Sequence, residues 1–304
     1  MSITNQLSVC EVPSTNRNIL IIGRKSRLEA SELGTARGLT ETSWKAMLRS
    51  IKAKDSARTT STWVGANKVA LAMLPESCSR HNSPSRAWAI TAACQSVVGP
   101  GKWSIVALID SQNATATAAA IAKAFSTFSA KSSTTIQRSI EVVLMGEDGV
   151  IMDTKLNSLM AGVQYAASLF DRPTSSLNVS DFVAEAESLT AIEGVSLEVI
   201  RGNELRDGGF GGFWGVGKAA QDPPALVCLR WSPKPNGPRV AWVGKGIVYD
   251  TGGLSLKSKT GMPGMKGDMG GAAAVLGAFR VAVNQRAPYN ISAVLCLAEN
   301  AIGP

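Results

Sequence analysis

The amino-acid sequence predicts an α/β protein with two domains. The chain has 304 residues, of which 45% are hydrophobic and 18% charged, and this length is enough to bury two separate cores. Short apolar runs alternate with alanine-rich stretches of helical periodicity, a pattern typical of a largely parallel sheet covered by helices. A segment rich in Ser, Thr, Asn and Pro begins after residue 170 and indicates a joint between the domains.

The first half of the chain supplies the strands and helices of an N-terminal α/β domain, which we place at residues 1–154. Between its apolar runs, residues 86–98 and 114–131 carry apolar side chains at helical spacing. The glycines of this half form no phosphate-binding loop. The apolar runs predict buried strands at residues 18–23, 69–74, 104–110 and 139–146.

The next segment predicts a linker helix and joint over residues 155–173, because an amphipathic stretch ends there at Asp-Arg-Pro. A second α/β domain follows at residues 174–304. Its first helix is expected to be capped by Ser180 and to run to residue 188. The remaining elements are strands at residues 195–200, 225–231, 239–248 and 291–297 and a helix at residues 269–283.

Charge and cysteine content limit the class of protein. The net charge is +8, from 31 Lys and Arg against 23 Asp and Glu, but the basic residues are scattered and form no run of five or six. This distribution argues against a nucleic-acid partner. The five cysteines are far apart and form no CxxC pair, so the sequence indicates neither a disulfide framework nor a zinc knuckle, and a reducing compartment fits. Without a signal sequence or eighteen consecutive apolar residues, we expect a cytoplasmic protein with no membrane partner.

The segment 243–268 concentrates Lys, Asp and Gly at the end of a predicted strand, where α/β proteins often bind ligands. Lys245 lies near the strand end, and Asp250 follows five residues later, before a Gly-Gly pair that permits a tight turn. Asp268 precedes a second Gly-Gly pair and a helix, where a carboxylate serves as a cap or as a metal ligand. From these residues alone, ordinary loop and cap roles are equally compatible.

This string resembles the first signature of the leucyl (cytosol) aminopeptidase family. The match includes Lys245, the spacing to Asp250, the Gly-Gly pair, a second lysine at Lys257, and Asp268 before Gly-Gly-Ala. The segment DRPTSSLNVSDFVAEA is similar to the joint between the family's two domains, and CLAENAIGP is similar to its next catalytic strand. The resemblance extends from about residue 165 to 304, and before that only the architecture is similar.

The resemblance implies an N-terminal accessory domain followed by the first part of a catalytic domain that removes N-terminal amino acids from peptides with two divalent metal ions, zinc or manganese. Lys245 and Asp268 would hold one metal, with the lysine as a neutral amine, and Asp250 would bridge both. Lys257 would stabilise the oxyanion. Met265 would line the pocket for the substrate's first side chain. Without the resemblance, a methionine is more often a core-filling residue than part of a pocket. The family forms hexamers, so a homo-oligomer is implied.

The family's second signature, Asn-Thr-Asp-Ala-Glu-Gly-Arg, is absent from the sequence. It would supply two further carboxylate ligands and an arginine, and the string Ala-Glu-Ala-Glu at residues 184–187 does not replace it. We therefore expect that this chain binds one metal weakly or none, that it lacks activity by itself, and that its catalytic domain is incomplete. We also expect the strand at residues 291–297 to have an unpaired edge and to favour aggregation.

Two other functions compete with this interpretation. Residues 212–218 match the phosphate-loop pattern G-x-x-x-x-G-K, but Ala219 stands where magnesium binding needs Ser or Thr, and Phe213 and Trp214 are bulky for a phosphate cradle. A non-catalytic binding or assembly protein, with nucleic acid as a possible ligand, is the second alternative, for which affinity should fall steeply with salt. The single histidine, His81, lies in a polar stretch typical of a solvated loop.

Overall fold

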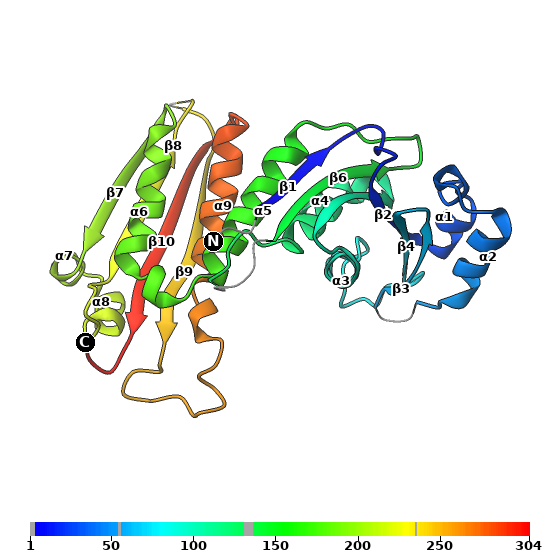
Figure 1. The fold of residues 1–304 in the computed structure, drawn as a ribbon. Coiled ribbons are helices and arrows are strands. Elements are labelled where there is room, and N and C mark those ends of the chain that lie inside the picture. Colours follow the sequence, from blue (N-terminus) through cyan, green and yellow to red (C-terminus); the bar gives the residue numbers. More distant parts are fainter. Residues whose placement is uncertain (1–3, 54–55, 131–135, 235) are drawn as a thin grey trace. The chain divides into compact units, whose positions relative to one another are not determined.

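The computed structural model describes residues 4–53, 56–130, 136–234 and 236–304. The chain divides into two compact units, Met1–Gln164 and Tyr165–Pro304, and the division falls within helix α5 (Lys155–Asp171). Each unit has its own sheet and its own hydrophobic core, so the predicted mixed α/β class is confirmed (Figure 1). The helices within the described ranges are too short or too polar to cross a bilayer.

Unit 1 is built on a six-stranded sheet with the order β1-β6-β5-β2-β4-β3, in which only the β3–β4 pair is antiparallel. The four predicted strands are present as β2, β4, β5 and β6. The sequence analysis missed β1 and β3, because these edge strands carry alternating exposed and half-buried residues instead of an apolar run. The strands are β1 Thr4–Val9, β2 Asn18–Arg24, β3 Arg58–Val64, β4 Asn67–Leu74, β5 Gly101–Leu108 and β6 Gln137–Met145.

Helices cover both faces of this sheet, as in a doubly wound fold. Successive strand residues point to opposite faces, so Ile19 and Ile21 of β2 pack with α1 (Lys25–Glu29) and α2 (Glu41–Ser50). Leu20 and Ile22 belong to the core on the other face. That face is covered by α3 (Ala87–Val97), α4 (Ala114–Lys123) and the first part of α5.

The helix predicted at residues 114–131 is too long. Helix α4 ends at Lys123, and the chain then turns so that Phe125, which is 2% exposed, packs into the core. The carbonyl of Ser126 accepts a hydrogen bond from the Asn5 side chain instead of continuing the helix. The end of the predicted helix, residue 131, lies outside the described residues.

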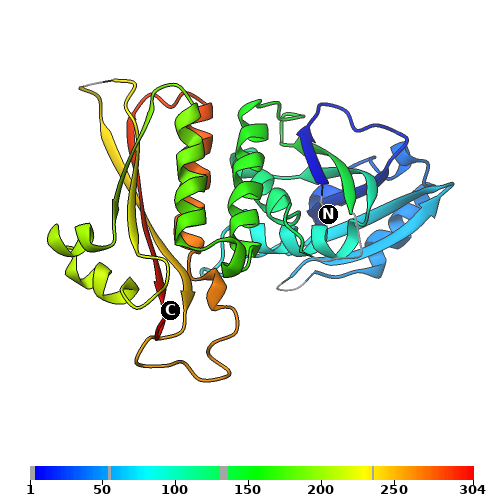
Figure 2. The same cartoon turned by 60° about the vertical axis from the view of Figure 1, so that its left-hand side comes forward.

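Unit 2 contains a four-stranded sheet with the order β7-β8-β10-β9, in which only the β9–β10 pair is parallel. Its strands are β7 Val195–Arg201, β8 Ala225–Trp231, β9 Arg239–Asp250 and β10 Asn290–Asn300. Helices α6 (Val179–Glu187) and α9 (Gly270–Asn284) pack against the same face of this sheet (Figure 2). Phe182 of α6 and Phe279 of α9 are fully buried in the core that the helices and the sheet share. Strand β10 pairs on both sides, so the expected unpaired edge at residues 291–297 is wrong. Among the described strands of this sheet, β7 and β9 lie at the two edges.

Two short helices and several 3-10 turns make up the rest of the regular structure in the described residues. In unit 2, α7 (Asn203–Asp207) and α8 (Gly211–Gly217) lie together near one end of the sheet (Figure 1). Five 3-10 turns are also present among the described residues: Thr35–Arg37, Ser111–Asn113, Thr174–Ser176, Ser188–Ala191 and Met265–Gly267.

The cap of helix α6 differs from the prediction. Asn178, not Ser180, is the N-cap: its side chain accepts a hydrogen bond from the Asp181 N–H at 2.8 Å, and the Asp181 carboxylate accepts one from the Asn178 N–H at 3.1 Å. This reciprocal pair is a capping box. Ser180 lies inside the helix, where its N–H and hydroxyl both donate to Asp222.

The structure argues against the phosphate-loop alternative. Residues Gly211–Gly217 form helix α8, so their backbone N–H groups are not arranged as an open loop around an anion. The ammonium of Lys218 lies 5.0 Å from the ring centre of Trp214, an aromatic contact typical of a cation–π pair.

Candidate metal centre

Strand β9 carries the first two predicted metal ligands. Lys245 lies midway along this strand, and not near its end as expected from the sequence, because the strand continues to Asp250, its last residue. The loop 251–264 then extends past the strand end before the chain returns to helix α9 (Figure 1). Asp268 lies in the short turn immediately before that helix.

Two glycines let the strand and the helix touch through their backbones. A Cβ on Gly244 would lie 2.7 Å from both the Ala272 Cα and the Gly271 carbonyl oxygen. A Cβ on Gly271 would lie 3.0 Å from the Lys245 backbone nitrogen. Because no side chain separates the two elements here, the start of α9 lies directly against Lys245. This close approach brings the Lys245 Nζ within 3.1 Å of the Asp268 Oδ2.

The chain leading into α9 is also anchored within unit 2. The Lys266 ammonium donates to the carbonyls of Phe170 and Asp171 at 2.9 and 3.0 Å. Gly267 lies against the Phe170 ring, since a Cβ there would lie 2.6 Å from its Cζ atom. Met265, the predicted pocket residue, begins this 3-10 turn and is half-buried.

Asp250 is the most extensively bonded of the predicted site residues. Its Oδ2 lies 3.0 Å from the Lys257 Nζ, so the predicted catalytic lysine pairs with the predicted bridging ligand. Its Oδ1 accepts hydrogen bonds from the Gly252 N–H at 2.9 Å and from the Asn300 amide at 2.7 Å. The Asp250 side chain is only 16% exposed, and these donors compensate for the lost hydration.

The same contacts set the protonation state of Asp250. Burial by itself would raise the pKa of this carboxyl. The hydrogen bonds from Lys257, Gly252 and Asn300 and the positive charge of Lys257 outweigh burial and hold its pKa below the ordinary value. Asp250 is therefore an anion at neutral pH in the metal-free protein.

Asn300 is a site residue that the sequence analysis missed. A β-bulge between Ala298 and Glu299 shifts the β9–β10 register and places Asn300 directly opposite Asp250. The Asn300 carbonyl also accepts hydrogen bonds from the backbone N–H and the hydroxyl of Thr251. A polar residue immediately after an apolar strand was the available signal, because strand ends line ligand sites in α/β proteins.

A cavity of about 470 Å³ opens beside these groups on unit 2. Lys245, Asp250 and Asn300 belong to its lining, whereas Lys257, Met265 and Asp268 do not. The other lining residues are apolar or weakly polar: Phe213, Val216, Val243, Ile247 and Cys296.

The donor set fits part of a divalent metal site. Asp250 and Asp268 supply carboxylate oxygens, and Lys245 supplies an amine, which binds a metal only after losing its proton. Each carboxylate is now neutralised by one lysine, through the two ion pairs at 3.1 and 3.0 Å. Within the described ranges, no three His, Cys, Asp or Glu side chains come together as a metal cluster.

Comparisons with known proteins agree with this arrangement. Residues 164–304 match the family model described as the cytosol aminopeptidase family, catalytic domain, and residues 17–134 match that of the M17 aminopeptidase N-terminal domain 2. A probable aminopeptidase, NPEPL1, of Mus musculus is 39% identical over 98% of this chain and 59% of its own length. Leucine aminopeptidase 1 of Caenorhabditis elegans is 38% identical over 77% of this chain and 48% of its own length.

Solved structures of the same family have the same fold. The structure of C. elegans leucine aminopeptidase has a TM-score of 0.83 and 32% identity, over 99% of this chain and 63% of that one. A Leishmania major leucyl aminopeptidase, solved in complex with actinonin, has a TM-score of 0.85 and 30% identity with the same coverage. The chain therefore belongs to the leucyl (cytosol) aminopeptidase family. It spans 59% of the length of the mouse relative and 63% of the solved C. elegans chain.

Proposed function

We propose that this chain provides the N-terminal part of a two-metal aminopeptidase centre that removes N-terminal amino acids from peptides. The observation that carries the proposal is the pair of Lys–Asp contacts that involve residues of β9, Lys245 with Asp268 and Asp250 with Lys257. Both pairs join residues that the family signature brings together, although 23 and 7 positions separate them (268 − 245 and 257 − 250).

In this proposal, Lys245 and Asp268 would hold one divalent metal, zinc or manganese, and Asp250 would be the ligand that it shares with a second. When bound, the two metals supply Lewis-acid activation of the peptide carbonyl and of water. Asp250 and Asp268 offset the positive charge of the metals. As a carboxylate already ionised in the metal-free state, Asp250 has no proton to release on binding.

Lys257 has a different role. Its ammonium pairs with the Asp250 carboxylate at 3.0 Å, and it would be free for another anion if Asp250 served as a metal ligand. We propose that Lys257 then stabilises the oxyanion that forms on the substrate carbonyl. Met265 would line the pocket for the substrate's first side chain, and Asn300 would keep Asp250 oriented through its 2.7 Å hydrogen bond.

The proposal extends to partners and location. Peptides are the expected substrates, a hexamer of identical chains is the expected assembly, and the cytoplasm is the expected compartment. The names of the relatives, which include probable cytosol aminopeptidases of bacteria, support this class.

The experiment uses a hybrid in which this chain is continued by the remaining segment of C. elegans leucine aminopeptidase 1. Hydrolysis of leucine p-nitroanilide and metal content are measured for Asp250→Asn, Asp268→Asn and Lys257→Ala. Both Asp variants should lose metal and activity together. Lys257→Ala should keep its metal while kcat falls about 100-fold or more, the effect of removing one oxyanion donor.

Lys259→Ala is the matched control, because Lys259 is an exposed lysine in the same loop. It should change neither metal content nor kcat. Full metal occupancy and turnover in Asp250→Asn would contradict the proposed site. If Lys257→Ala lost as much metal as the two Asp variants, Lys257 would be a metal ligand and not an oxyanion donor.

A further inference from the structure

A second cavity lies in unit 1 and shares no residue with the metal centre. Its volume is about 910 Å³, within the range of roughly 300–1,000 Å³ usual for small-molecule sites. It lies beyond the carboxyl ends of the adjacent parallel strands β2 and β4, where Lys25 follows one strand and Pro75 the other.

The topology of the sheet creates this cavity. The helices that follow β2 pack on one face of the sheet, and helix α3, which follows β4, packs on the other. The chains that leave these two strands therefore go to opposite faces, and the cavity lies between them at the carboxyl ends of the strands, the edge of the sheet at which open α/β proteins bind ligands. Leu48 of α2 and Trp88 of α3 accordingly line the same cavity from opposite sides.

The charged groups of the lining favour an anion. The lining contains Lys25, Arg49 and Lys52 and a single carboxylate, Glu76, which already accepts a hydrogen bond from the Ser26 N–H at 3.0 Å. Among the described residues, Arg49 and Lys52 form no ion pair, while Lys25 is 3.6 Å from Glu29. The lining therefore carries two more positive than negative charges (three cations minus one carboxylate).

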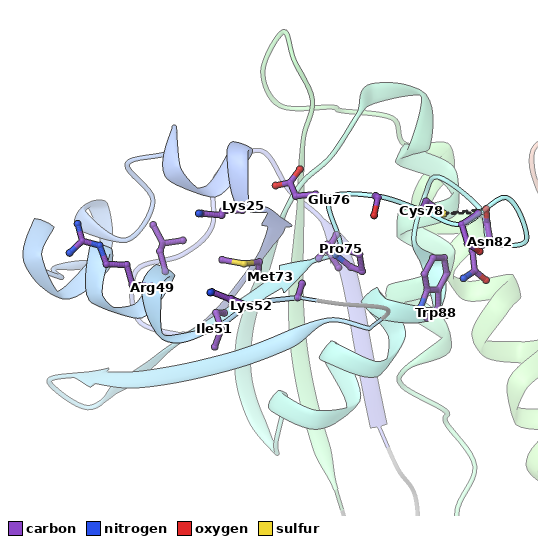
Figure 3. A pocket seen from close by; sticks show the side chains of 15 residues that line it. Lys25, Arg49, Ile51, Lys52, Met73, Pro75, Glu76, Cys78, Asn82 and Trp88 are labelled. Atoms are coloured by element: carbon purple, nitrogen blue, oxygen red, sulfur yellow. Dashed lines mark hydrogen bonds between the residues drawn. The ribbon is translucent and has the colours of Figure 1, made fainter.

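The two ends of the cavity differ in character. Figure 3 shows the three basic side chains at the end formed by α1 and α2, and Asn82 and Trp88 at the other end. Trp88 is half-buried and supplies an aromatic surface. A ligand that extends along the cavity would meet cations at one end and an indole ring at the other.

The wall between the two ends is held rigid by a buried arginine. Arg86 is 7% exposed, and its guanidinium donates to the carbonyls of Pro75, Glu76 and Pro84 at 2.5, 2.6 and 2.5 Å. These bonds join both ends of the segment that carries the cavity residues Ser77, Cys78 and Asn82. The site is therefore formed before any ligand binds, which lowers the entropic cost of binding.

We propose that this cavity binds a small phosphate monoester that carries a planar ring, such as a nucleoside monophosphate. The phosphate dianion matches the two excess positive charges and lies at Lys25 and Lys52, and the ring lies on Trp88. This inference is independent of the proposed peptidase function, because none of its residues belongs to unit 2.

Isothermal titration calorimetry of the 304-residue chain with adenosine monophosphate tests the proposal, in low salt with a chelator so that metals do not contribute. One saturable site is expected. Lys52→Gln should weaken binding about tenfold, which is about 1.4 kcal/mol, because one charge-assisted contact is lost. Adenosine and inorganic phosphate, which each lack one half of the ligand, should both bind more weakly. Trp88→Leu should weaken the binding of the monophosphate more than the binding of inorganic phosphate.

Lys102→Gln is the matched control, because Lys102 is an exposed lysine at the opposite, amino end of the parallel strand β5. It should leave binding unchanged. Alkylation of Cys78, a thiol in the cavity lining, should slow when the ligand is bound, whereas alkylation of Cys228 in unit 2 should not. The proposal would be overturned if millimolar monophosphate did not bind, or if Lys52→Gln and Lys102→Gln lost the same affinity for it. It would also be overturned if inorganic phosphate bound as tightly as the monophosphate.

Discussion

At the scale of single residues, the candidate centre depends on the ion pair and the hydrogen bonds that hold one carboxylate, Asp250, in place. Asp250 is held by donors from three parts of the chain: Lys257 in the following loop, Gly252 in the turn, and Asn300 at the end of β10. Gly252 can make this contact because its φ of 90° lies in the left-handed region, which a side chain disfavours. The orientation of Asp250 is therefore fixed without a metal.

Replacing Lys257 by alanine should raise the pKa of Asp250 in the metal-free protein, because a hydrogen bond and a positive charge are lost. A carboxyl with a depressed pKa stabilises the fold above its unfolded pKa of about 3.9, and this contribution disappears as the pH falls through the folded pKa. The stability difference between wild type and variant should thus be largest near neutral pH and shrink in acid. Carboxyl-carbon NMR with a chelator measures the titration directly.

Lys259→Ala provides the comparison for this titration, since it removes the same charge from the same loop without touching Asp250. The Asp250 titration in that variant should follow the wild type. An unchanged titration in Lys257→Ala would show that the ion pair does not form in solution.

At the scale of secondary-structure elements, the decisive contact is the one between β9 and α9. Gly244 and Gly271 let the two backbones meet, and this contact determines that Lys245 and Asp268 share a site. Any side chain at Gly244 would overlap main-chain atoms, which cannot move aside as a flexible side chain can.

Gly244→Ala should destabilise unit 2 by about 1–3 kcal/mol, the usual cost of an overpacked contact. Urea unfolding followed by circular dichroism measures this loss. Gly215→Ala is the control, because Gly215 lies in helix α8 with no atom within 4 Å of the added Cβ. Alanine there should be neutral or stabilising by up to about 1 kcal/mol. Equal stability of the two variants would mean that the strand and the helix lie farther apart than described.

Helix α6 allows a separate test at this scale. Asn178→Ala should cost about 0.5–2 kcal/mol of stability, because the N-cap acceptor for the Asp181 N–H is lost. Asn178→Ser retains a capping oxygen and should lose much less. A larger loss in Ser180→Ala than in Asn178→Ala would instead favour the cap predicted from sequence, although Ser180 also bonds to Asp222.

At the scale of the whole molecule, the count of metal donors limits what the 304-residue chain can do. Two clustered dications repel each other and need several carboxylates nearby, whereas the proposed site contains Asp250, Asp268 and one amine. The chain alone should therefore hydrolyse leucine p-nitroanilide no faster than buffer, even with added zinc or manganese. C. elegans leucine aminopeptidase 1 serves as the positive control. Comparable turnover by the two proteins would mean that the proposed metal site is wrong or that another chain completes it.

The sequence by itself determined the α/β class, most element positions and the family, because these depend on local patterns. Apolar runs located β2, β4, β5 and β6, and the spacing of Lys245, Asp250 and Asp268 carried the resemblance. Local patterns failed at edge strands such as β3, whose polar residues lack a buried face to mark them.

Only the tertiary structure decided which distant residues share a site. Asn300 reaches Asp250 because parallel pairing and a bulge bring the ends of β9 and β10 together, and neither feature is visible in a one-dimensional pattern. The unit 1 cavity likewise joins Lys25, Lys52 and Trp88, which no motif connects. Their proximity follows from neighbouring strands whose helices cover opposite faces, so it depends on chain topology and not on local sequence preference.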